Sequence, residues 1–131
     1  MSWRTGGLAL NGGFDYVRAR LDQGSDRDLP RIPPQRWRLQ GTLDWMDFQA
    51  VLSWMSASAQ TDVAANELPT DSFDDLRVRL SYAGVLRGSE FEIFLSGRNL
   101  TDDEQRFHAS FIGNLAPQPG RTIEVGLRLA F

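Results

Sequence analysis

The residue types that could support chemistry in this chain are few, and most lie in one polar segment. The single histidine, His108, follows three consecutive carboxylates at residues 102–104, which together could offer a metal ion one nitrogen and several oxygens. One histidine among scattered carboxylates lacks the ligand spacing of a metal site, so we expect no metal there. Ser110 lies two residues from His108, but closeness in a loop does not supply the fixed geometry that a nucleophile and its base require. We therefore expect no catalytic residue and no cofactor.

Composition excludes several other kinds of site. The chain has no cysteine, so disulfides, cysteine-ligated metals and thiol nucleophiles are excluded. Its 14 basic residues are all arginine, and its 17 acidic residues bring the formal net charge to -3. A nucleic-acid-binding surface needs a basic excess or stripe, so we expect no nucleic-acid partner. The 131 residues suffice for one domain, and no stretch approaches the ~18 consecutive apolar residues of a membrane-spanning helix.

Alternation of apolar and polar residues runs through most of the chain and predicts an all-β protein. The clearest example is residues 121–131, in which every second side chain is apolar: Ile123, Val125, Leu127, Leu129 and Phe131. Five further segments show the same period and are expected to be strands: 7–21, 36–45, 47–59, 75–82 and 90–98. In the first of these the phase slips near Tyr16, which predicts a bulge or an exit from the apolar layer.

The six predicted strands are joined by connections that alternate in length. Short connections are expected at residues 46–47 and 83–89, and long ones at 22–35, 60–74 and 99–120. All six prolines lie in the long connections, which leaves the strand interiors free for ladder hydrogen bonds. This pattern predicts an antiparallel up-and-down meander with both termini on the side of the short turns.

Such a meander would separate apolar from charged side chains. One face is expected to carry Leu76, Val78, Leu80, Phe91, Ile93, Leu95, Ile123, Val125, Leu127 and Leu129. The other face is expected to carry the charged residues Arg36, Arg38, Asp44, Arg77, Arg79, Glu90, Glu92, Glu124 and Arg128. On this face the four arginines at positions 36, 38, 77 and 79 could form charge ladders, that is, cross-strand ion pairs, with Glu90 and Glu92. On this assignment, replacing Leu127 with arginine would destabilise the protein in a membrane, because the charge would face lipid. Replacing Gly126 with arginine would destabilise it little, because that residue lies on the charged face.

This alternation fits a soluble sandwich or lipocalin-like barrel as well as a transmembrane barrel. The charged face needs water, either outside a soluble fold or inside a barrel lumen. Aromatic residues gather toward strand ends, as in the rings at membrane interfaces, although core aromatics near the ends of a sandwich give the same pattern: Trp37, Trp45, Phe48, Trp54, Tyr82, Phe91 and Phe131. The strict alternation of short and long connections is typical of outer-membrane barrels.

A set of motifs lies near the C-terminus. The run Gly97-Arg-Asn-Leu-Thr-Asp-Asp-Glu104 is followed by Ala116-Pro-Gln-Pro-Gly-Arg121 and a final alternating segment that ends in Phe131. With Leu29-Pro-Arg-Ile-Pro-Pro34 upstream, these motifs resemble the C-terminal barrel of TonB-dependent outer-membrane receptors. In that family an Asn-Leu-x-Asp/Asn step closes the penultimate strand, and a Pro-x-Pro-Gly-Arg approach leads into the last. The matching residues are Asn99, Leu100, Asp102, Pro117, Pro119, Gly120, Arg121 and Phe131.

The resemblance implies that residues 1–131 are the last strands and three outer loops of a β-barrel in the outer membrane of a Gram-negative bacterium. In a complete receptor the barrel would hold a plug domain and take up an iron-siderophore or similar scarce nutrient, energised by TonB through the N-terminal part. The sequence shows neither a plug domain nor a signal peptide, so we expect a partial, non-enzymatic barrel. Its ligand-binding residues are not identified by the resemblance.

The implied partners are outer-membrane lipid, the rest of the barrel and plug, and the barrel-assembly machinery. In the family this machinery reads the last strand, here Ile123, Val125, Leu127, Leu129 and the terminal aromatic Phe131. Six strands alone would leave two sheet edges unpaired, so we expect residues 1–131 not to form a stable soluble monomer. The alternative is a small soluble β-barrel or sandwich that binds an apolar ligand.

Overall fold

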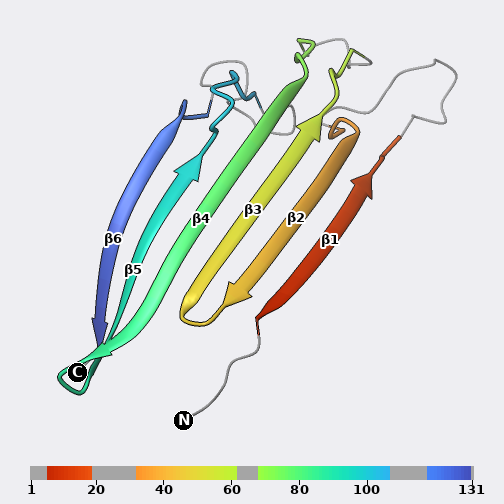
Figure 1. Ribbon diagram of the computed structural model, residues 1–131. Coiled ribbons are helices and arrows are strands. Elements are labelled where there is room, and N and C mark those ends of the chain that lie inside the picture. The colour runs from red at the N-terminus through yellow and green to blue at the C-terminus, as the bar shows by residue number, and fades with distance from the viewer. Residues whose placement is uncertain (1–5, 19–31, 62–67, 107–117, 131) are drawn as a thin grey trace, which may run out of the picture.

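A computed structural model describes residues 6–18, 32–61, 68–106 and 118–130, which form a single antiparallel sheet. Its strands are β1 (Gly7–Asp15), β2 (Arg36–Trp45), β3 (Phe48–Ala57), β4 (Phe73–Leu86), β5 (Ser89–Arg98) and β6 (Thr122–Ala130). They lie side by side in chain order (Figure 1), so the predicted meander of six strands is confirmed. Within the described ranges β1 and β6 are edge strands and the sheet is not closed. No helix in these ranges is long and apolar enough to cross a membrane.

The short turns lie at one end of the sheet, and the sheet's first and last strands begin and end there. β1 begins with Gly7 opposite Asp44, close to the turn between β2 and β3. β6 ends with Ala130 opposite Glu90, close to the turn between β4 and β5. Figure 1 shows the same arrangement, with the described parts of the long connections at the opposite end. β1 therefore begins and β6 ends on the predicted side, and the termini themselves, residues 1–5 and 131, lie outside the described residues.

The boundaries of β4 differ most from those expected. The predicted segment 75–82 lies inside a 14-residue strand that continues to Leu86. The connection expected at 83–89 is consequently a two-residue turn, Arg87-Gly88, and the expected boundary was wrong. Both turn residues have positive φ, 53° and 89°, as in the type I′ turns that suit two-residue hairpins. Glycine is common in turns, so Gly84 suggested that the strand had ended. Val85 is an apolar residue on the polar face, so it breaks the alternation of apolar and polar residues near the end of β4.

β1 is shorter than the predicted segment 7–21. Its pairing with β2 is continuous from Gly7 opposite Asp44 to Asp15 opposite Arg36, and this paired stretch contains no bulge. The slip in phase near Tyr16 therefore marks the end of the strand. β3 likewise ends at Ala57, two residues earlier than expected. Residues 19–21 and Phe131 lie outside the described residues.

The register places the apolar side chains together. Leu80 lies opposite Leu95, and Leu95 lies opposite Val125. Residues directly opposite in an antiparallel pair share a face, so the ten apolar residues predicted on β4, β5 and β6 do share one. The same face continues over β1, β2 and β3 through Leu8, Leu10, Phe14, Trp37, Leu39, Leu43, Trp45, Phe48, Leu52 and Trp54. The charged residues lie on the other face, as predicted.

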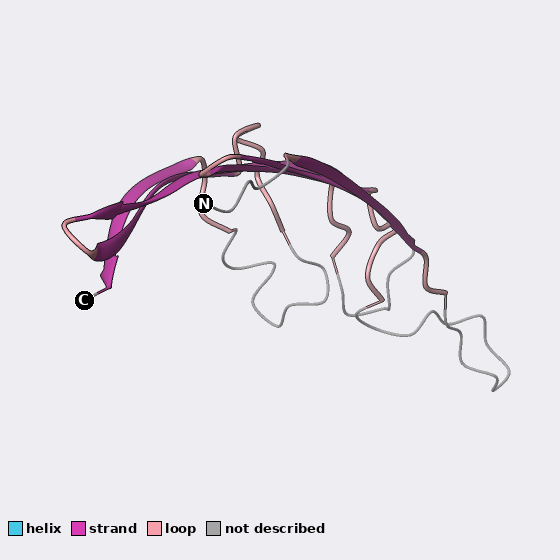
Figure 2. Ribbon diagram, turned by 60° about the horizontal axis from the view of Figure 1, so that its bottom comes forward, coloured by secondary structure: helices cyan, strands magenta, loops and turns pink. Residues whose placement is uncertain are grey.

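The sheet is a single curved layer. Figure 2 shows it bent into an arc, with described loop segments both on the hollow side and rising above the convex side. The apolar face is open to solvent along its length, with Leu10 69% and Val125 71% exposed. The buried strand residues Ala57, Phe73 and Asp75 instead belong to the polar face at the long-loop end. Since side chains on that face are buried whereas those of the apolar face are exposed, we assign the polar face to the concave side.

Phe94, the apolar residue out of phase in β5, packs across the polar face onto β6. It lies directly opposite Gly126, where an added Cβ would collide with the Phe94 ring. The guanidinium carbon of Arg79 lies 4.2 Å from the centre of the same ring, a cation–π contact. The other face repeats the arrangement, because a Cβ on Gly84 would lie 2.8 Å from the ring of Phe91 opposite it. The expectation that an arginine at Gly126 would cost little is therefore wrong.

We predict that Gly126→Ala lowers the free energy of unfolding by about 1–3 kcal/mol, because the new methyl group must displace the Phe94 ring. Urea-induced unfolding of the protein refolded in detergent, followed by tryptophan fluorescence, measures the change. Gly13→Ala is the control, since a Cβ there meets nothing within 4 Å on the same face, and it should change stability by less than about 0.5 kcal/mol. Equal effects of the two substitutions would contradict the packing of Phe94 on Gly126.

Candidate functional site

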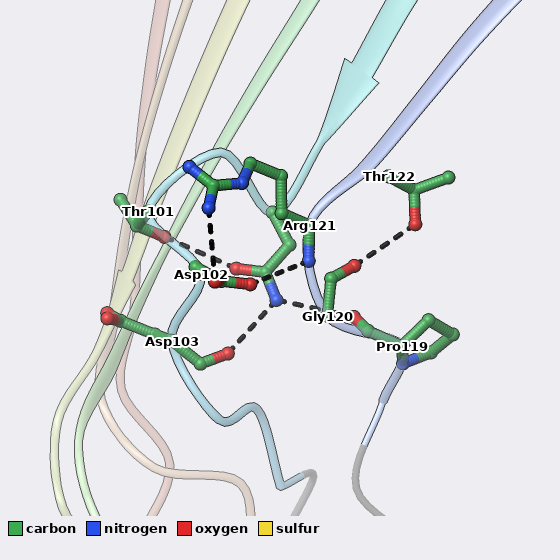
Figure 3. Close-up of polar contacts among 8 residues, drawn as sticks. Thr101, Asp102, Asp103, Pro119, Gly120, Arg121 and Thr122 are labelled. Carbon is green, nitrogen blue, oxygen red and sulfur yellow. Dashed lines mark hydrogen bonds and ion pairs between the residues drawn. The ribbon is translucent and has the colours of Figure 1, made fainter.

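A hydrogen-bonded network ties the end of β5 to the start of β6 (Figure 3); we call it the clasp, formed by residues 99–103 and 119–122 with Asp74. Its centre is Asn99, which is 4% exposed and has a positive φ of 48°. The Nδ2 group of Asn99 donates to the carbonyl oxygens of Asp103 at 3.0 Å and Pro119 at 3.3 Å. Asparagine tolerates this left-handed backbone better than most residues, and its amide here bridges two chain segments.

Asp102 makes the second link of the clasp. Its backbone N–H donates to the carbonyl oxygen of Asn99 at 3.0 Å, and its φ is 61°. Its Oδ1 accepts from the backbone N–H of Arg121 at 2.9 Å, and its Oδ2 lies 3.3 Å from Nη2 of the same arginine. A Cβ on Gly120 would lie 3.3 Å from Asp102 Oδ1, so glycine leaves room for the carboxylate. The first residues of β6 are thereby held in place.

The clasp also reaches β4. Thr101 Oγ1 donates to the carbonyl oxygen of Asp74 at 2.8 Å, and the N–H of Asp74 donates to Asp103 Oδ2 at 2.9 Å. The N–H of Leu100 donates to the carbonyl oxygen of Leu76 at 3.0 Å. These bonds connect β4 with the segment that links β5 and β6.

The structure brings together most of the motif residues singled out in the sequence. Asn99, Leu100, Asp102, Pro119, Gly120 and Arg121 all belong to the clasp or adjoin it, whereas Pro117 and Phe131 lie outside the described residues. Asp74 was missed, because its part in the clasp depends on a contact 27 residues away. The polar groups of the clasp bond mainly to one another, which indicates a positioning role for these residues.

No group of three or more histidine, cysteine, aspartate or glutamate side chains in the described ranges could hold a metal ion. His108 and Ser110, considered as candidates above, lie outside those ranges.

Aromatic rings on the apolar face form a row near the short turns. Trp45 and Phe48 have ring centres 6.2 Å apart, Phe48 and Tyr82 4.7 Å, and Tyr82 and Phe91 5.9 Å. This row crosses β2, β3, β4 and β5 without a break. Amphipathic rings in such a row suit the interface between lipid headgroups and hydrocarbon.

A second aromatic group lies toward the long loops. The rings of Phe14 and Trp37 are 4.4 Å apart on β1 and β2. Trp37 and Trp45 are eight positions apart on β2, which corresponds to roughly 26 Å along a strand. A strand tilt of about 40° would reduce this to about 20 Å, comparable with the ~25 Å apolar band of outer-membrane barrels. Aliphatic side chains fill the zone between the two groups: Leu10, Leu39, Leu43, Leu52, Val78, Leu80, Ile93 and Leu95.

Ion pairs cross the concave face, but only one of the predicted ladder contacts forms. Glu92 accepts from Arg79 at 3.0 Å and from Arg128 at 3.2 Å, which links β4, β5 and β6. Glu90 has Val85 and Ala130 opposite it, so its neighbours across the strands are apolar and the register explains why the expected pairing fails.

The remaining predicted ladder arginines have other partners. Arg77 pairs with Asp75 of its own strand at 2.5 Å, and Arg38 pairs with Asp15. Arg36 makes no ion pair with a described residue, although Asp15 lies opposite it, because Arg38 takes that carboxylate. The expectation that Arg36, Arg38 and Arg77 face Glu90 and Glu92 was therefore wrong.

Comparison with known proteins does not assign the chain to a family. No protein-family model matches the chain, and no curated protein matches its sequence. The functional interpretation therefore rests on the two faces of the sheet, the clasp and the sequence motifs.

We predict that Asp102→Ala lowers the free energy of unfolding by about 1–3 kcal/mol, because it removes the acceptor of the Arg121 N–H and places alanine at positive φ. Asp102→Asn keeps an oxygen acceptor and removes the charge, so it should cost at most about 1 kcal/mol. Chemical unfolding of both variants measures the difference. Asp47→Ala is the control, since that exposed turn side chain bonds to no described residue. Equal losses in the two Asp102 variants would contradict the assigned hydrogen bond.

Proposed function

We propose that this protein forms part of the wall of a transmembrane β-barrel in the outer membrane of a Gram-negative bacterium. The observation that carries the proposal is the continuous, exposed apolar face bordered by two groups of aromatic rings. An exposed apolar surface of this extent is unfavourable in water and favourable against lipid hydrocarbon. The membrane-facing side of such a barrel has the same succession of aromatic, aliphatic and aromatic zones.

The concave face supports the same proposal. Several of its arginines are paired with carboxylates across strands but remain partly exposed, with the Arg128 side chain 74% exposed. Such a face requires water, which the lumen of a barrel supplies. The free backbone groups along β1 and β6 would each cost several kcal/mol in hydrocarbon, so the proposed barrel also needs neighbouring strands at both edges.

The more specific proposal is a TonB-dependent receptor, of which these would be the last strands. It rests on the resemblance of residues 97–131 to the C-terminal strands of that family. Six matching residues meet in or beside the clasp, at the step from β5 to β6. The complete receptor would take up an iron-siderophore or similar scarce nutrient with energy from TonB. This part would contribute wall and loops, and the barrel-assembly machinery would recognise its last strand.

We predict that Leu10→Arg strongly reduces binding of the protein to zwitterionic lipid vesicles, whereas Asn11→Arg does not. Leu10 is central in the apolar zone, where an arginine costs about 2–4 kcal/mol in a bilayer, and its neighbour Asn11 lies on the concave face. Both positions are exposed on the same strand, so the pair controls for charge and for strand propensity. Flotation of refolded protein with vesicles in a density gradient gives the bound fraction.

Light scattering of detergent-free protein tests the alternative of a soluble barrel or sandwich that binds an apolar ligand. The membrane proposal expects aggregation or a requirement for detergent. A sharp monomer peak with cooperative thermal unfolding, or equal vesicle binding by the two arginine variants, would overturn it in favour of the soluble fold.

A further inference from the structure

The concave face holds a groove of about 420 Å³ that crosses β1, β2, β3 and β4. This volume lies within the ~300–1,000 Å³ range typical of sites for small molecules. Its lining includes two neighbouring cross-strand rows, one of Gly13, Arg38, Met55 and Asp75, and one of Asn11, Gln40, Ser53 and Arg77. A Cβ on Gly13 would meet nothing within 4 Å, so the groove is open at its β1 end.

The exposed lining of this groove is mainly apolar, and three residues with uncharged hydrogen-bonding groups cross its middle. Asn11, Gln40 and Ser53 lie directly opposite one another on three strands. None of these three side chains makes a hydrogen bond with a described residue. Amide and hydroxyl groups both donate and accept, so the row can bind neighbouring hydroxyl groups of a ligand in several combinations.

Asp75 adds an acceptor at the β4 side. It is 3% exposed, its Oδ2 accepts from Arg77 Nε at 2.6 Å, and its Oδ1 is buried without a hydrogen-bond partner. A buried carboxylate oxygen is costly without a donor, so this position favours a ligand that can donate.

The charges at the groove are already balanced. Arg38 is paired with Asp15, and Arg77 with Asp75. A small ion would therefore meet no unpaired opposite charge, whereas a neutral molecule with several hydroxyl groups could use the whole row. We propose that the groove binds a neutral polyhydroxylated small molecule, a sugar or sugar alcohol, through Asn11, Gln40, Ser53 and Asp75. This inference concerns the concave face alone and holds whether or not the apolar face contacts lipid.

Titration of the full chain with maltose tests the proposal. The protein is kept in a polyoxyethylene detergent, because detergents with sugar headgroups would compete. Side-chain amide signals of Asn11 and Gln40 in ¹H–¹⁵N NMR spectra report occupancy, and ethylammonium and acetate serve as charged probes. We expect saturable shifts with maltose at millimolar concentrations and none with either ion.

Two matched pairs of variants locate the site, with binding followed by calorimetry. Gln40→Ala should weaken maltose binding about five-fold or more, whereas Gln49→Ala, an amide on the same face outside the groove, should leave it unchanged. Gly13→Leu should block the groove, whereas Gly7→Leu, equally open but outside it, should not. Circular dichroism checks the fold of each variant.

Several results would overturn the inference. One is the absence of saturable maltose binding, and another is tighter binding of either charged probe. Equal binding within either matched pair would show that maltose binds elsewhere. The vesicle experiment on Leu10 concerns the opposite face, so failure of either proposal is distinguishable from failure of the other.

Discussion

The unbroken antiparallel register is the constraint on which the rest of this structure depends. From Gly7 opposite Asp44 to Arg98 opposite Thr122, five strand pairs keep the alternating apolar residues of all six strands on one face. A slip of one residue in any pair would move a whole strand's apolar set to the charged side. In a single layer no second sheet or helix within the described residues can compensate for such an error, so cross-strand contacts carry the specificity.

Several features of the sheet serve to fix that register. Glycines lie opposite large rings at two places, Gly126 with Phe94 and Gly84 with Phe91, and each ring covers the backbone of its partner strand. Glu92 links Arg79 and Arg128 across three strands. The clasp determines where β6 begins, because Asp102 binds the N–H that precedes its first paired residue. Each of these contacts joins different strands or segments. Together they stabilise the described part of the sheet, which has no central hydrophobic core.

The sequence predicted the strands, their order and their faces because a period of two depends only on neighbours along the chain. It failed where the pattern was ambiguous or where partners were distant. Val85 on the polar face concealed the end of β4, and a phase slip at Tyr16 proved to be the end of β1. The partners of Arg38 and Arg77 could not be predicted, since Arg38 takes the carboxylate opposite Arg36 and Arg77 pairs with Asp75 of its own strand. Asp74 joins the clasp only through the fold.

The directions of the edge strands limit how a proposed barrel could close. The six strands alternate in direction, so β1 and β6 run in opposite directions. Each edge strand therefore needs an antiparallel neighbour. If strand direction alternates all the way around the barrel, the number of additional strands must be even. Six strands are fewer than the ~8 of the smallest membrane barrels, so the curvature of the arc would have to be continued by such neighbours. Asp15 on β1 and Glu124 on β6 are the outermost carboxylates of the concave face among the described residues. In a closed barrel, the ion pairs of this face would continue from these two strands onto the neighbouring strands, which would supply their own charged residues.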